Sequence, residues 1–219
     1  MTDTPAGPAL LRLLSWLSPA FPVGAFAYSH GLESAVHEGL VHDRASLQGW
    51  LSVLVAHGSG WNDAVLLAEA WREATSGGDA GAVAELGQAL AGSRERHLET
   101  TLQGAAFGEA VSAWLPGLPS DLPYPVAVGV AAGRSGVALE AALLGFLHAF
   151  SANLVQAALR LVPLGQRDGV ATLAAFEPLL LDTAARAARS SLDDLGSSST
   201  SSDILSMRHE ALYSRVFRS

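Results

Sequence analysis

The chain has 219 residues, of which 49% are hydrophobic and 16% are charged, and a formal net charge of −8. This length and apolar content support one substantial core and exclude a largely disordered chain, so we expect a single domain over residues 1–219. The balance of 13 basic against 21 acidic residues excludes nucleic acid as a primary ligand, and the absence of cysteine excludes disulfides, thiolate metal sites and cysteine nucleophiles.

Helical periodicity runs through nearly the whole chain, and no stretch alternates with the period of a β-strand. In the first half, proline and glycine separate the periodic segments, with a rigid turn at Pro19 to Gly24. The pattern predicts helices over residues 8–17, 26–40, 45–57, 64–75 and 82–114, the last as a pair of helices around Gly92 and Ser93.

The second half begins with a proline-rich break over residues 116–125. Helices are predicted over residues 127–132, 137–162 and 172–192, followed by an amphipathic segment over 204–217. Between the last two, residues 193–203 are dominated by serine and glycine, which predicts a mobile loop. The predicted class is all-α, a compact multi-helix domain with a flexible Ser-rich loop before its C-terminal segment.

Residues 141–159 form an apolar run without a formal charge. Asn153, Gln156 and Arg160 fall on one helical stripe, which favours a buried helix with a polar face over a membrane span. The N-terminus lacks the basic region of a secretory signal. We therefore expect a cytoplasmic protein without a membrane contact, with a helical membrane component as the competing hypothesis.

Several glycines interrupt helical patterns, where each costs about 1 kcal/mol relative to alanine. The pattern predicts close approach of helix backbones at these positions, which are Gly104, Gly108, Gly129, Gly133 and Gly145.

Motifs for catalysis are missing from the sequence. It has no phosphate-binding P-loop, and His37 and His42 are five residues apart where a zincin motif needs four. No catalytic residue is therefore predicted, and the protein is not expected to be an enzyme.

One cluster has the chemistry of a metal site. His30, Glu33 and His37 lie at i, i+3 and i+7, which would place two imidazoles and a carboxylate on one face of the predicted helix over 26–40. These ligands suit Ni²⁺ or Zn²⁺. The alternative is an exposed polar stripe, and the competing function would be a metal-dependent hydrolase built on this face.

A second charged group lies on the helix predicted after Ser93. Arg94, Glu95, Arg96, His97 and Glu99 form a charged face, for which the default interpretation is a solvated surface stabilised by ion pairs. The functional alternative is an electrostatic docking surface.

Four segments in order resemble the urease accessory protein UreF family. They are residues 18–33 (SPAFPVGAFAYSHGLE), residues 124–132 (YPVAVGVAA), Asn153 with residues 160–166 (RLVPLGQ), and residues 208–219 (RHEALYSRVFRS). Val216 and the serine-rich stretch over 197–202 depart from the family pattern without touching the main motifs.

This resemblance implies an all-α, dimeric protein without catalysis of its own. It implies a chaperone that bridges a UreD/UreH-type accessory protein and the GTPase UreG, so that nickel reaches apo-urease. No resident cofactor is implied, only a transient nickel contact, for which His30, Glu33 and His37 are the predicted ligands.

The resemblance also directs attention to residues that would bind partners. In the first and last segments these are Pro22, Gly24, Phe26, Tyr28, Glu33, Tyr213, Arg215 and Phe217. For the aromatic residues of the first segment, ordinary core packing is the alternative. The C-terminal segment over 204–219 is predicted to order on a partner, with docking on its own core as the alternative.

Overall fold

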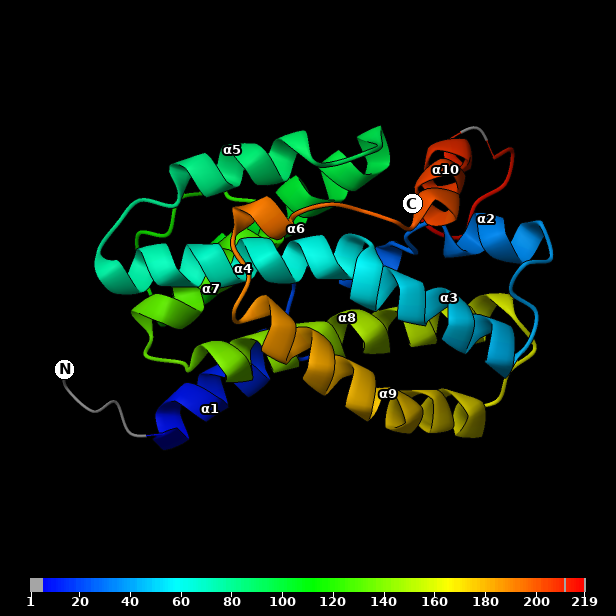
Figure 1. Ribbon diagram of the computed structural model, residues 1–219, viewed down its shortest axis with the longest axis horizontal. Helices are drawn as coiled ribbons and strands as arrows, with labels where there is room; N and C mark the ends of the chain where they lie inside the picture. The colour runs from blue at the N-terminus through cyan, green and yellow to red at the C-terminus, as the bar shows by residue number, and fades with distance from the viewer. Residues whose placement is uncertain (1–5, 211, 219) are drawn as a thin grey trace.

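The computed structural model describes residues 6–210 and 212–218, and within these ranges every regular element is a helix (Figure 1). The all-α prediction is therefore confirmed. The elements are α1 (Ala6–Trp16), η1 (Ala25–Ala27), α2 (Leu32–His37), α3 (Arg44–His57), α4 (Ser59–Ser76), α5 (Gly81–Ala89), α6 (Arg94–Val111), α7 (Tyr124–Arg134), α8 (Leu139–Leu161), α9 (Gln166–Ala187), η2 (Leu192–Asp194) and α10 (Thr200–His209).

Helix α4 runs through the centre of the molecule (Figure 1). It packs against α7 most extensively and also against α3, α5, α8 and α9. Every residue from Asp63 to Ala68 is buried, so no solvent-facing stripe exists in this part of the helix. A helix buried on all sides is typical of the core of a larger helical protein.

Close backbone approach explains the glycines of α7, as predicted. A Cβ atom on Gly129 would overlap the carbonyl oxygen of Leu67 in α4, and one on Gly133 would lie 2.9 Å from the carbonyl oxygen of Trp71. Gly104 is closer still to the backbone at Leu122, whereas Gly108 has only ordinary contacts. For Gly145 the prediction is wrong, because it meets the side chains of Leu13 and Leu17 and not a helix backbone. Glycine therefore fixes how closely α4 and α7 pack.

The predicted helix over 26–40 is wrong. The chain forms the single 3₁₀ turn η1, an extended residue at Tyr28 and then the short helix α2. Gly24, Gly31 and Gly39 all have left-handed backbone conformations, with φ between 74° and 76°. Left-handed residues cannot continue a right-handed helix, so the glycines divide the segment.

Helices α4, α9 and α10 depart most from their predicted bounds. Helix α4 begins at Ser59, directly after α3, and α9 begins at Gln166 and continues through Pro178. Helix α10 begins at Thr200, inside the predicted loop, and ends at His209. The preceding strap is held by hydrogen bonds from Gly196 N to Asn62 Oδ1 and from Ser198 N to His57 O; its mobility stays a prediction.

Helix α8 is the one helix in the described ranges that is long and apolar enough to cross a membrane. Half of its most apolar window is buried, and it packs against α9, α4 and α2. This environment is that of a core helix, in line with the sequence-based interpretation.

The close packing of α4 and α7 leads to a stability prediction. Substituting Gly129→Ala should lower the free energy of unfolding by about 1–3 kcal/mol, because the new methyl group must push the two helices apart. Urea unfolding followed by circular dichroism would measure this change.

Gly49→Ala is the matched control, because a Cβ atom there has nothing within 4 Å. In that variant the higher helix propensity of alanine should stabilise the protein by up to about 1 kcal/mol. Equal effects of the two substitutions would contradict the packing argument.

Candidate functional site

The loop before α2 turns two titratable side chains into the protein. His30 has a φ of 51°, an uncommon value for a residue with a Cβ, and Gly31 follows with φ of 76°. Gly31 also lies against α10, where a Cβ would come within 3.0 Å of the backbone. As a result His30 and Glu33 are each only 8% exposed.

His30 belongs to a buried chain of polar groups, the His30 cluster, made of His30, Ser59, Asp63, Arg96 and Glu99. The imidazole Nδ1 lies 3.1 Å from Ser59 Oγ, and Nε2 lies 3.0 Å from Glu99 Oε1. Arg96 pairs with Glu99 at 3.1 Å and donates a hydrogen bond to the Asp63 carboxylate. Each charge therefore faces an opposite charge, the condition for burying ions.

The Glu99 carboxylate stays ionised in this environment. Burial by itself would raise the pKa of Glu99, but the attraction of His30 and Arg96 outweighs burial and lowers the pKa to about 2. The cluster is thus held together by charge at neutral pH.

A second group, the His209 cluster, is made of Glu33, Glu95, His209 and Arg215. His209 is completely buried, with Nε2 at 3.0 Å from Glu33 Oε2 and Nδ1 at 2.8 Å from Glu95 Oε2. Arg215 donates to the other oxygen of Glu95. Both ring nitrogens of His209 thus face a carboxylate oxygen.

The tail after α10, residues 212–218, is clamped by the same Glu33 carboxylate. The amides of Val216 and Phe217 donate to its two oxygens at 2.7 and 2.9 Å. Burial raises the pKa of Glu33, but these amides and His209 outweigh it and hold the pKa below its ordinary value. Arg218 N also donates to Ala27 O at 2.7 Å.

Aromatic packing completes the docking of the tail. The Phe217 ring is 4% exposed, and the guanidinium carbon of Arg160 lies 4.5 Å from its centroid. The tail thus docks on the protein's own core, which is the alternative that the sequence left open. Its binding to a partner stays a prediction.

The shared helical face predicted for His30, Glu33 and His37 does not exist, because His30 precedes α2 in a left-handed conformation. His30 faces Glu99, Glu33 faces His209, and His37 is exposed at the end of α2. Across the described residues, no group of three or more His, Cys, Asp or Glu side chains is arranged to hold a metal ion. A transient nickel contact stays a prediction without this geometric basis.

The residues predicted to bind partners divide by exposure. Pro22, Phe26, Tyr213 and Arg215 are exposed, Phe26 at 72% and Tyr213 completely. Gly24 is half-buried. Tyr28, Glu33 and Phe217 are buried, as the core-packing alternative expected for Tyr28, and this burial raises the pKa of the Tyr28 hydroxyl.

The charged face predicted on α6 is only partly solvated, because Arg94 and His97 are exposed whereas the two glutamates are buried. Glu95 and Glu99 are 9% and 3% exposed. With Gln103 and Phe107 they form a buried stripe at four-residue spacing. The stripe continues to the aromatic core residue Phe107, but the groups that make burial of Glu95 and Glu99 possible belong to other elements and are not visible in the stripe itself.

Comparison with known proteins agrees with this geometry and gives the family. A family model described as UreF matches residues 41–177. A urease accessory protein UreF of Mesorhizobium japonicum is 60% identical over the whole of both chains. The chain belongs to the UreF family.

A second relative, urease accessory protein UreF 1 of Brucella abortus, is 59% identical over 96% of this chain and 94% of its own length. The UreF family model covers neither the loop with His30 nor α10 and the tail, whereas the Mesorhizobium relative covers the whole chain. The likeness to UreF proteins therefore includes the segments that build both charged clusters.

The lowered pKa of Glu33 leads to a prediction on acid stability. The ionised carboxylate stabilises the fold above the ordinary pKa of 4.5, and this contribution is lost as the pH falls through the lowered value. Between about pH 5 and about pH 3, the unfolding free energy of Glu33→Gln should therefore fall less steeply than that of the wild type. Urea titrations at several pH values would measure the two slopes.

Glu85→Gln, at an exposed position on α5, is the control and should keep the wild-type slope. The role given to Glu33 would be refuted by parallel slopes for Glu33→Gln and the wild type.

Proposed function

We propose that this UreF-family protein is a non-catalytic adaptor that bridges a UreD/UreH-type accessory protein and the GTPase UreG, so that nickel is inserted into apo-urease. The observation that carries the proposal is the pair of aromatic side chains, Phe26 and Tyr213, that stand exposed beside the charged clusters. Exposed aromatic residues on an ordered backbone are the side chains most enriched among binding hot spots.

The loop before α2 and the tail are joined by a backbone hydrogen bond. This joint holds the two aromatic residues in place. The Phe26 carbonyl accepts a hydrogen bond from Arg160, and the neighbouring residue Ala27 is bonded to the tail at Arg218. Val216, also in the tail, is 56% exposed. A surface ordered before binding loses less entropy when a partner arrives, so the clusters support binding without touching a partner themselves.

The alternative, a metal-dependent hydrolase at His30, Glu33 and His37, is not favoured. The first two side chains are engaged in different ion-pair clusters and the third is exposed on the surface. We propose that nickel is cargo of the assembled complex and that this chain holds no resident cofactor. We also propose that the protein is a homodimer in the cytoplasm, and this part of the proposal rests on the resemblance to the family.

Loss of the protein in a urease-positive host should leave the urease subunits present but poor in nickel, because the enzyme cannot be loaded. Urease purified with and without this chain would be assayed for activity and nickel content, and complementation with the wild type should restore both. Fully metallated, active urease in its absence at ordinary nickel levels would contradict the adaptor role.

Point variants test the surface more sharply than deletion of residues 208–219, because that deletion also removes the partners of buried Glu33. Phe26→Ala and Tyr213→Ala should each weaken capture of the UreD/UreH-type protein or UreG at least about 10-fold. Both side chains are exposed, so the unfolding free energy should change by less than about 0.5 kcal/mol. Quantitative pull-down and urea unfolding would measure the two effects.

Leu181→Ala on α9 is the matched control, because this side chain is an apolar residue exposed at 57% on a helix that does not contribute to either cluster. It should leave both measurements unchanged. Normal partner capture by Phe26→Ala and Tyr213→Ala would show that the joint is structural only.

A further inference from the structure

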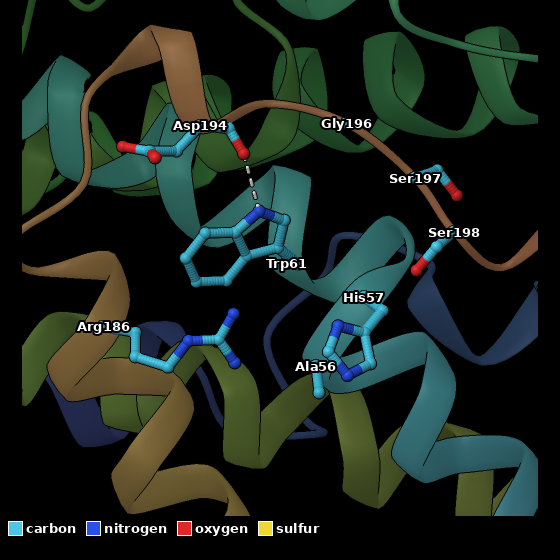
Figure 2. A pocket seen from close by; sticks show the side chains of 8 residues that line it. All are labelled: Ala56, His57, Trp61, Arg186, Asp194, Gly196, Ser197 and Ser198. Atoms are coloured by element: carbon cyan, nitrogen blue, oxygen red, sulfur yellow. Dashed lines mark hydrogen bonds between the residues drawn. The ribbon is translucent and has the colours of Figure 1, made fainter.

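A cleft of about 410 Å³ opens on a face of the protein that belongs to neither cluster. It lies where α3 ends and α4 begins, beneath the strap that follows η2, and the last turn of α9 forms its floor (Figure 2). Arg186, His57, Trp61 and Ser198 are the lining residues with polar side-chain groups on which the argument rests.

The Arg186 guanidinium is fixed in position by an aromatic ring. Its central carbon lies 4.5 Å from the centroid of the Trp61 ring. The indole is itself oriented, because Nε1 donates to the Asp194 carbonyl at 2.9 Å (Figure 2). Stacking on an aromatic face leaves the in-plane N–H groups of an arginine available for another ligand.

The charge of Arg186 is poorly compensated by the protein. Among the described residues, Arg186 forms an ion pair with Asp182 alone, at 3.9 Å, and the Asp182 side chain is 67% exposed. Asp194 lines the same cleft, but its carboxylate accepts hydrogen bonds from Ser191 and points away from Arg186 (Figure 2). Arg96, by contrast, is paired with two carboxylates.

Two further donors border the same space. The His57 ring is exposed and lies on the wall beside Arg186, and the Ser198 hydroxyl comes from the strap above (Figure 2). The strap is held in place by the hydrogen bond from Ser198 N to His57 O at 2.9 Å. Guanidinium, imidazole and hydroxyl groups can all donate to an anionic oxygen.

We propose that this cleft receives the carboxylate of a glutamate or aspartate side chain carried by a partner protein. A planar guanidinium binds a planar carboxylate through two parallel hydrogen bonds, which is the geometry left open by the Trp61 stack. The cleft is larger than a carboxylate alone and open to solvent, so it has room for the chain that carries it. The inference rests on the proposed adaptor function and adds to it the chemistry of one contact.

The test uses the full chain and a defined probe, the capped peptide acetyl-Ala-Glu-Ala-amide. The signal is the indole N–H resonance of Trp61 in ¹H–¹⁵N spectra, assigned with Trp61→Phe. The glutamate peptide should shift this resonance saturably, and the matched glutamine peptide should bind at least about 10-fold more weakly.

Arg186→Gln should weaken binding of the glutamate peptide at least about 10-fold, and Arg186→Lys should weaken it as well, because lysine keeps the charge but lacks the planar fork. Arg167→Gln, an exposed arginine at the other end of α9, is the control and should bind like the wild type. Circular dichroism would confirm that each variant is folded, and Arg186→Lys provides the test if Arg186→Gln is not.

An equal response to the glutamine peptide, or an unchanged affinity in both Arg186 variants, would overturn the proposal. Tighter binding of inorganic phosphate than of the glutamate peptide would overturn it too, since the cleft would then be a site for a free oxyanion. The assay contains no accessory protein, so its failure leaves the adaptor function standing. Failure of the urease complementation, in turn, would not change the peptide result.

Discussion

The imidazole of His209 between the carboxylates of Glu33 and Glu95 is the group on which one end of the molecule depends. All three side chains are buried, and a buried charge is tolerated only when opposite charges and hydrogen bonds surround it. Removing one member of such a group typically costs about 3–5 kcal/mol, because it leaves the others unpaired. The loop before α2, α6 and the tail are therefore held to one another by these buried polar contacts.

This arrangement has a consequence for partner binding. The tail is already docked in the single chain, with two of its amides on Glu33. A partner that contacts Phe26 and Tyr213 where they stand binds without disturbing the clusters. A partner that binds Phe217 must first displace the tail and so break its contacts with the His209 cluster. The free energy with which the tail docks is therefore subtracted from the binding free energy of a partner that displaces the tail. A partner that leaves the tail in place does not incur this cost.

The rest of the fold is stabilised by a different principle. Helices α4 and α7 meet through glycines and small apolar residues at backbone contact, which produces a closely packed frame at the centre of the fold. Two arginines illustrate the contrast between core and surface. Arg96 is paired with two buried carboxylates, whereas Arg186 is stacked on Trp61 with its charge largely uncompensated.

The sequence by itself determined the helical class and the approximate positions of α1, α3, α5, α6 and α8, because helical periodicity depends on residues close along the chain. It also indicated close packing at Gly129 and Gly133, since a glycine inside a helical pattern is visible without knowing which helix it meets. The resemblance in residues 18–33 and 208–219 also pointed to the family before any contact was known. Only the tertiary structure decided that Glu95 and Glu99 are buried, that His30 and Glu33 belong to separate clusters, and that the tail docks on its own core. The physical reason is that a charged stripe looks the same in sequence whether it faces water or buried polar partners. For Glu95 those partners are His209 and Arg215, more than 100 positions away along the chain.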